Sequence, residues 1–184
     1  MSDLYPNEEE TILGKLSWVK EKLTLDDVDI DIQAAAEYYL DEILLEKLDN
    51  TPKKLLSFGD RYLLFETSFM NQPFYLQEFI FKAISQGYKP VLAHPERYSY
   101  VQNDPSILDD LVQRGVLLQL NIISLAGYYS KPVKKLAEKL IDQQKIHFIG
   151  SDCHNLQQFL ALKEAMTTRH YKKALDLPLI NYKL

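Results

Sequence analysis

Residues that can bind a metal or a phosphate follow one short apolar run after another along this chain. The runs are QAAAE, YLLFE, PVLAHPER, VLLQLNIIS and IHFIGSDCHN. The candidate residues at or near the ends of these runs are Glu37, Glu66, His94, Arg97, Asn121, Ser124, Asp152 and His154. Carboxylates and imidazoles that repeatedly follow buried strands are typical of an α/β active site.

Asp152 and His154 form an Asp-x-His pair directly after an apolar run. A spacing of two at the end of a strand points both side chains the same way, towards one metal, while Cys153 faces away. The alternative is that Asp152 caps the following helix and His154 is an exposed loop residue. The pair alone leaves both interpretations open.

The remaining ligand candidates differ in how strongly their surroundings favour a metal. Glu66 closes the apolar run 62–65, where a carboxylate is costly unless it is paired or coordinated. Glu37 follows three alanines and could equally begin an acidic helix. Pro95 predicts an extended backbone at His94, and a single histidine at the end of a strand is more often a packing residue than a ligand.

Arg97 offers a planar guanidinium, which matches a phosphate with two parallel hydrogen bonds; a surface salt bridge is the alternative. Asn121 and Ser124 could orient a substrate or a metal ligand, or satisfy the backbone of a turn. Cys153 does not indicate a thiol phosphatase, because no phosphate-cradling loop with an arginine follows it. Imidazole and carboxylate ligands together suit Mn²⁺, Fe or Zn²⁺, and two or more such ions would activate water for phosphoryl displacement.

These residues need a scaffold of alternating strands and helices. The patterns predict strands at 28–36, 61–66, 90–93, 116–121 and 146–150. They predict helices at 12–23, 41–48, 75–86, 104–115, 133–141 and 156–174. Connections of helical length favour a parallel sheet, whose ligands bind beyond the carboxyl ends of the strands.

The bulk properties describe one ordinary globular domain. The 184 residues are 46% hydrophobic and 26% charged, and the net charge of -5 argues against a nucleic-acid partner. One cysteine favours a reducing compartment. No apolar run approaches the roughly 18 residues of a membrane span, and the first 20 residues do not resemble a signal peptide. We therefore expect a cytoplasmic protein without direct membrane insertion.

Five βα units preceded by a helix are fewer than a closed (β/α)₈ barrel needs, since such barrels have at least about 200 residues. The sheet is therefore expected to be open, or the barrel incomplete.

Several segments together resemble the polymerase-and-histidinol-phosphatase (PHP) superfamily. They are EYYLD, YLLFE, GYKPVLAHPERY, RGVLLQLNIISLAGYYSKPVKKLAEKLI and HFIGSDCHN, within residues 5–155. Within that superfamily they look like the bacterial metal-dependent tyrosine phosphatases of capsule and exopolysaccharide synthesis. The combination of AHPER with SDCHN at this distance is specific.

The resemblance implies a distorted α/β barrel that holds a cluster of metals, usually manganese or iron, at the carboxyl ends of its strands. The positions that match the family's metal ligands are Glu37, Glu66, His94, Asp152 and His154. Arg97 matches the arginine that holds the substrate phosphate and is the catalytic candidate, with Asn121 and Ser124 as further substrate-binding candidates. The implied reaction is hydrolysis of phosphotyrosine by metal-activated water, and the implied partner is the phosphorylated tyrosine kinase of polysaccharide export.

The chain departs from this family at its beginning. The family opens with a His-x-His strand and a Thr-Pro-His segment, and neither occurs here, where the histidines are His94, His147, His154 and His170. His147 lies within a predicted strand and is expected to be buried or structural. We therefore expect residues 1–184 to be a single domain that corresponds to the C-terminal portion of the family barrel. Its exposed sheet edge could support a homo-oligomer.

Two alternatives to the tyrosine phosphatase remain. One is a non-catalytic remnant or phosphopeptide-binding module. The other is a PHP phosphoesterase that acts on a small phosphate such as histidinol phosphate.

Overall fold

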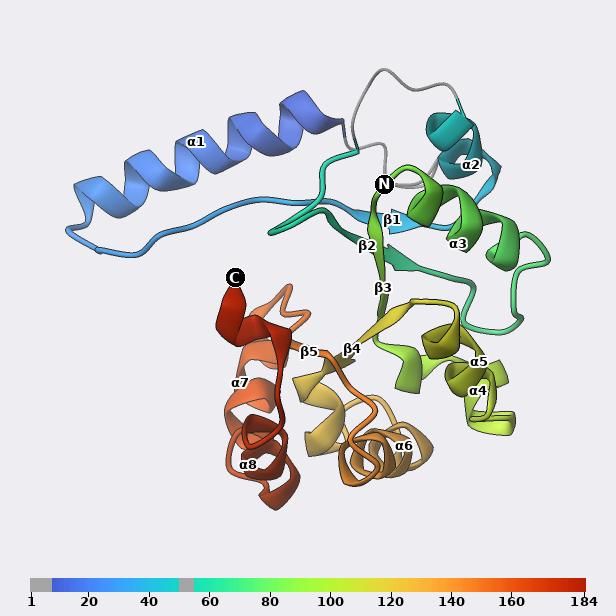
Figure 1. Cartoon of the computed structure of the whole chain (residues 1–184). Helices are drawn as coiled ribbons and strands as arrows, with labels where there is room; N and C mark the ends of the chain where they lie inside the picture. The colour runs from blue at the N-terminus through green and yellow to red at the C-terminus, as the bar shows by residue number, and fades with distance from the viewer. Residues whose placement is uncertain (1–7, 50–54) are drawn as a thin grey trace.

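A computed structural model describes residues 8–49 and 55–184 of the chain. Five strands form one sheet in sequence order, and each pairs in parallel with the next (Figure 1). The strands are β1 (Glu37–Tyr39), β2 (Tyr62–Glu66), β3 (Lys89–Ala93), β4 (Leu117–Asn121) and β5 (Phe148–Gly150). Because all five run the same way, the residues that follow them meet at one edge of the sheet.

Helices connect successive strands. The α-helices are α1 (Glu9–Leu25), α2 (Glu42–Asp49), α3 (Leu76–Ser85), α4 (Ser99–Asn103), α5 (Ile107–Gln113), α6 (Lys131–Asp142), α7 (Leu156–Ala165) and α8 (Arg169–Leu175). The described part of the chain also contains three short 3₁₀ helices, η1 (Pro95–Arg97), η2 (Ile122–Ala126) and η3 (Ile180–Lys183). The α/β class and the parallel sheet are confirmed, and the first five predicted helices lie within a few residues of their expected positions.

The strand predicted at 28–36 is wrong. Those residues pair with no strand among residues 8–49 and 55–184, and β1 begins only at Glu37, opposite Leu64 of β2. The alternation VDIDI satisfies the pattern of a strand, but residues 28–31 are exposed and lie in an extended segment beside α1. Together with α1, which buries no residue, this segment projects from the sheet as an arm (Figure 1).

The single helix predicted at 156–174 is two helices. The hydroxyls of Thr167 and Thr168 donate to the carbonyls of Glu164 and Ala165, each at 2.7 Å, and so satisfy the carbonyls at the end of α7. Thr168 also accepts from the N–H of Tyr171 and begins α8 as its N-cap. These local hydrogen bonds compete with a continuous helix, as threonine side chains often do.

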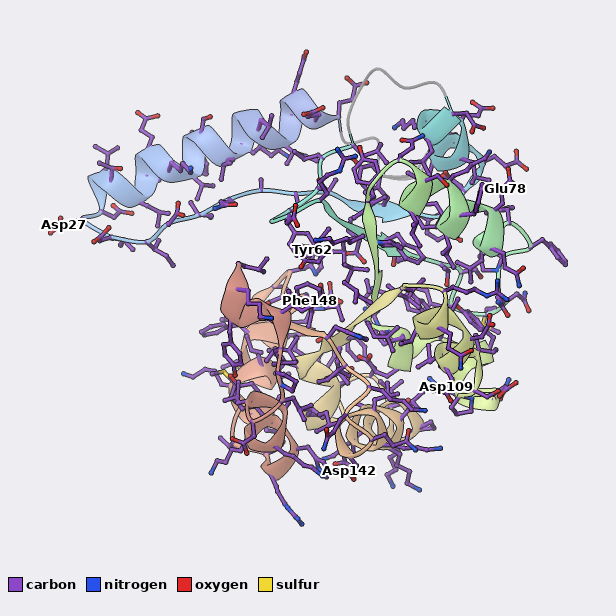
Figure 2. The ribbon with its side chains drawn as sticks, viewed as in Figure 1. Asp27, Tyr62, Glu78, Asp109, Asp142 and Phe148 are labelled. Carbon is purple, nitrogen blue, oxygen red and sulfur yellow. The ribbon has the colours of Figure 1, made fainter. Side chains whose placement is uncertain are left out.

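The sheet is strongly curved. The ring of Tyr62 in β2 and the ring of Phe148 in β5 meet edge to face, with centroids 5.2 Å apart, although two strands separate them (Figure 2). Phe58 packs against both rings. The curvature resembles that of a barrel, but β1 and β5 stay unpaired with each other within residues 8–49 and 55–184.

The core lies between this sheet and the helices that cover it. Helix α3 buries one face through Leu76, Phe79, Ile80 and Ala83. Burying one large apolar side chain contributes about 1.5 to 3 kcal/mol, so such faces fix the helices and hence the strand ends. None of the described helices has the length and apolar character needed to cross a membrane.

Candidate functional site

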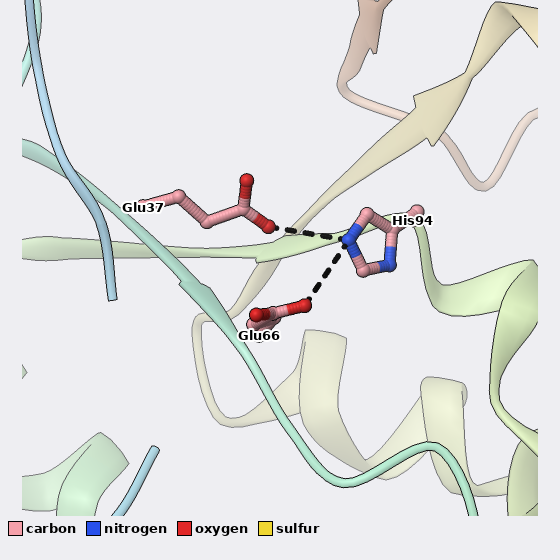
Figure 3. Close-up of side chains that lie close together, drawn as sticks. All are labelled: Glu37, Glu66 and His94. Atoms are coloured by element: carbon pink, nitrogen blue, oxygen red, sulfur yellow. Dashed lines mark hydrogen bonds and ion pairs between the residues drawn. The ribbon is translucent and has the colours of Figure 1, made fainter. Parts of the chain in front are cut away.

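Three neighbouring strands bring two carboxylates and an imidazole together. Glu37 begins β1, Glu66 ends β2, and His94 directly follows β3 (Figure 3). The Nε2 atom of His94 lies 3.2 Å from Oε1 of Glu37 and 3.5 Å from Oε2 of Glu66. We call these residues the Glu–Glu–His cluster. Residues up to 57 positions apart in the sequence thus converge on one ring nitrogen.

The donor set of this cluster fits a metal ion. One ligand atom from each residue lies within 4.8 Å of the others. Burial raises the pKa of Glu66, and the neighbouring Glu37 carboxylate raises it further. Burial also acts to raise the pKa of Glu37, but its hydrogen bond with His94 and the charges of His94 and Arg97 outweigh that effect and lower it. A cation bound between the two carboxylates would reduce the repulsion between their negative charges.

His94 has a left-handed backbone conformation, with φ 35° and ψ 52°. The extended backbone predicted from Pro95 is therefore wrong. The hydrogen bond from the His94 N–H to the carbonyl of Gln119, 2.8 Å long, and the η1 turn that begins at Pro95 hold this conformation. Asp152 is also left-handed, with φ 47°. Such conformations cost about 1 to 3 kcal/mol in residues other than glycine and cluster at functional sites.

Arg97 and Asp152 form an ion pair beside the cluster. The Nη1 atom of Arg97 donates to Oδ2 of Asp152 over 2.7 Å, and the Asn121 side chain donates to the same oxygen over 3.0 Å. Asn121 also donates to the hydroxyl of Tyr129 at 2.9 Å. The structure therefore joins three of the predicted residues, which come from η1, the end of β4 and the loop after β5, into one network.

Aromatic rings surround the Arg97 guanidinium. Its central carbon lies 4.2 Å from the ring centroid of Tyr129 and 4.9 Å from that of Phe69. Phe69 also stacks on the ring of His94, with 9° between the planes. Neither aromatic residue was predicted from the sequence, because a phenylalanine or tyrosine in a loop carries no spacing signal.

Glu96 is a further residue that the motifs did not reveal. Its side chain is fully buried, and Oε1 accepts hydrogen bonds from the Asn121 N–H at 3.1 Å and the Ser124 hydroxyl at 2.7 Å. Burial raises the pKa of this carboxyl. Ser124 is itself fully buried, so its hydroxyl supports Glu96 from within the core and lies out of reach of a ligand in solvent.

The loop after β5 differs from its predicted form. Strand β5 ends at Gly150, so Asp152 and His154 do not share one side of a strand, and Cys153 lines the same pocket as both of them. The side chain of His154 is 72% exposed, and its Nδ1 atom lies 3.0 Å from the carbonyl oxygen of Asp152. Their roles as metal ligands stay predictions.

A pocket of about 270 Å³ opens where these elements meet. It is lined by Glu37, Leu64, His94, Gln119, Asn121, Ser151, Asp152, Cys153 and His154. Most of these residues lie at the carboxyl ends of the strands, so the pocket is where a parallel α/β sheet binds ligands.

Known proteins resemble this chain over most of its length. A family model described as "Capsular polysaccharide synthesis, CpsB/CapC" matches residues 2–174. Tyrosine-protein phosphatase YwqE of Bacillus subtilis (strain 168) is 31% identical over 156 residues, which are 84% of this chain and 60% of YwqE. Tyrosine-protein phosphatase CpsB of Streptococcus pneumoniae is 30% identical over 161 residues, which are 83% of this chain and 65% of CpsB.

The putative tyrosine-protein phosphatase CapC of Staphylococcus aureus is 29% identical over 170 residues, which are 91% of this chain and 66% of CapC. The chain thus spans 60 to 66% of the length of these three relatives. A solved structure from work on YwqE and CpsB, described as unique metal-dependent tyrosine phosphatases, superimposes with a TM-score of 0.76 at 25% identity. The match covers 97% of this chain and 78% of that one.

Proposed function

Because the chain belongs to the CpsB/CapC family of capsular polysaccharide synthesis, we propose that it is a metal-dependent protein-tyrosine phosphatase. The observation that carries this proposal is the Glu–Glu–His cluster beside Arg97, which puts carboxylate and imidazole donors near a guanidinium, a group suited to bind phosphate. The relatives named as tyrosine-protein phosphatases support this reaction class.

In this proposal Glu37, Glu66 and His94 hold the metal, and Asp152 and His154 extend the ligand set from the loop after β5. We propose Mn²⁺, with Fe and Zn²⁺ as the alternatives that the same ligand types accept. When bound, such an ion supplies a Lewis acid that activates water and offsets charge on the phosphate.

Arg97 binds the phosphate of the substrate. A guanidinium has five N–H donors in a planar fork, so one can hold Asp152 while others face a phosphate oxygen. The ion pair with Asp152 and the contact with Tyr129 orient the guanidinium before the substrate arrives. Asn121 holds Asp152 in place through its amide group. Because the guanidinium is already in position, it can stabilise the negative charge of the phosphate without rearrangement of the protein.

The proposed substrate is the phosphorylated tail of a tyrosine kinase that controls polysaccharide export, and the proposed compartment is the cytoplasm, where such tails lie. The family's description in capsular polysaccharide synthesis supports this assignment. A second copy of the chain, paired along the exposed sheet edge, is a further proposed partner, because unpaired strand edges attract other strands.

The test is hydrolysis of a phosphotyrosine peptide by the purified chain with Mn²⁺, Fe²⁺ or Zn²⁺ and after chelation. We expect metal-dependent release of phosphate, lost in His94→Ala and in Asp152→Asn. His170→Ala is the matched control, since His170 lies away from the pocket, between Glu138 and Asp142. A folded protein that releases no phosphate with any of the metals would refute the proposal. Phosphopeptide binding that needs no metal would then indicate a binding module, and turnover of histidinol phosphate alone would indicate the small-molecule enzyme.

A further inference from the structure

Phe69 is a large aromatic residue that remains 37% exposed although it touches two residues of the site. Its ring lies nearly parallel to that of His94, with centroids 5.7 Å apart. The Arg97 guanidinium lies 4.9 Å from the centre of the same ring. The exposed part of Phe69 is therefore an apolar surface directly beside the group that would hold a phosphate.

The position of this ring is fixed by the backbone. The Ser99 N–H donates to the carbonyl oxygen of Phe69 at 2.7 Å, which ties the loop after β2 to the start of α4. Tyr98 packs against Phe69 with centroids 5.4 Å apart, and Tyr98 is itself fully buried. The Tyr98 hydroxyl also accepts the N–H of Thr67, two residues before Phe69. The ring thus has its place in the protein before any ligand is present.

We propose that Phe69 is a specificity-determining residue that binds the aromatic ring of an aryl phosphate. The inference deepens the proposed function and rests on phosphate being held at Arg97. In an aryl phosphate one bridging oxygen separates phosphorus from the ring, so a phosphate at Arg97 brings that ring to Phe69. An alkyl phosphate such as phosphoserine has no ring to place there.

The contact of two aromatic rings, offset-stacked or edge to face, gives the expected size of the effect. Such pairs contribute enough beyond simple burial to change an affinity about two- to tenfold. Phe69 should therefore raise the affinity for aryl over alkyl phosphates by that factor. Any effect that its ring has through its contacts with Arg97 and His94 should be the same for aryl, alkyl and inorganic phosphate, so the ratio between these ligands isolates the direct contact with the aryl ring.

The experiment measures equilibrium binding of phenyl phosphate, methyl phosphate and inorganic phosphate to the whole chain after chelation of metal, so that no hydrolysis depletes the ligand. We compare wild type with Phe69→Leu, which keeps an apolar side chain but removes the ring. Phe69→Tyr restores a ring at the same position. Phe81→Leu is the matched control, because Phe81 is 73% exposed on α3 and has no part in the site. Circular dichroism and thermal unfolding check that each variant folds.

We expect Phe69→Leu to weaken phenyl phosphate binding about two- to tenfold more than it weakens the binding of methyl phosphate and inorganic phosphate. Phe69→Tyr and Phe81→Leu should bind all three as wild type does. The inference is overturned if Phe69→Leu weakens all three equally or none, or if the wild type has no preference for phenyl phosphate. Failure to hydrolyse a phosphotyrosine peptide, with that preference intact, would refute the proposed function and leave the role of Phe69 standing.

Discussion

The stability of the site should depend on the buried carboxyl of Glu96, which joins η1 to the end of β4 and to η2. Replacing Glu96 with alanine removes the acceptor of two buried donors, the Asn121 N–H and the Ser124 hydroxyl. Each buried donor left without an acceptor costs about 1 to 3 kcal/mol, and the lost methylene costs about 0.8 kcal/mol.

The substitution also removes an unfavourable feature of the folded protein, which offsets part of this loss of stability. Its Oε2 atom is buried without a hydrogen-bond partner among the described residues, and the Ser124 hydroxyl can rotate. We therefore expect Glu96→Ala to lower the free energy of unfolding by about 2 to 4 kcal/mol. Glu96→Gln keeps an oxygen that can accept both hydrogen bonds, so it should stay within about 1 kcal/mol of wild type.

The assay is urea unfolding followed by far-ultraviolet circular dichroism, with the slope m checked to be equal across variants. Glu46→Ala is the control, because Glu46 lies exposed on α2 and a surface change there should alter stability by no more than about 0.5 kcal/mol. Two results would contradict this reasoning. One is a free energy of unfolding for Glu96→Ala within about 1 kcal/mol of the wild-type value. The other is a loss of stability in Glu96→Gln as large as that in Glu96→Ala.

Three further predictions concern His147, Arg97 and Glu66. His147 accepts the Leu118 N–H through Nδ1, and burial lowers its pKa from 6.5. His147 therefore becomes protonated at a higher pH in the unfolded chain than in the folded one, so the free energy of unfolding should fall as the pH drops below 6.5. His147→Asn should reduce the dependence of this free energy on pH. Arg97→Lys should raise KM for a phosphotyrosine peptide about tenfold, because an ammonium cannot bind phosphate in a planar, bidentate way. Glu66→Gln should reduce the rise in Tm that Mn²⁺ produces, since metal bound only to the native state stabilises it by mass action.

Each of these has a clear contrary result. An unchanged pH slope in His147→Asn would show that other groups control stability in that range. A KM for Arg97→Lys equal to that of wild type would remove Arg97 from phosphate binding. An undiminished Mn²⁺ shift in Glu66→Gln, read by differential scanning calorimetry, would exclude Glu66 as a ligand.

Much of the fold followed from local patterns. The apolar runs predicted four of the five strands, because short continuous apolar segments of this length are typical of the strands of a parallel sheet. The same patterns misassigned 28–36, since alternation describes a half-buried strand but says nothing about whether a partner strand is available. The break between α7 and α8 depended on the hydroxyls of Thr167 and Thr168, whose competition with helical hydrogen bonds is a matter of local geometry.

The candidate site, like the fold, could be predicted only in part from the sequence. The sequence by itself determined the chemical types, since Glu37, Glu66 and His94 each lie at or beside the end of an apolar run and the parallel sheet brings such ends together. Only the tertiary structure decided the pairing of Arg97 with Asp152. It also decided the burial of Glu96 and the place of Phe69. These depend on the left-handed turns at His94 and Asp152 and on contacts between distant loops, which no spacing along the chain encodes.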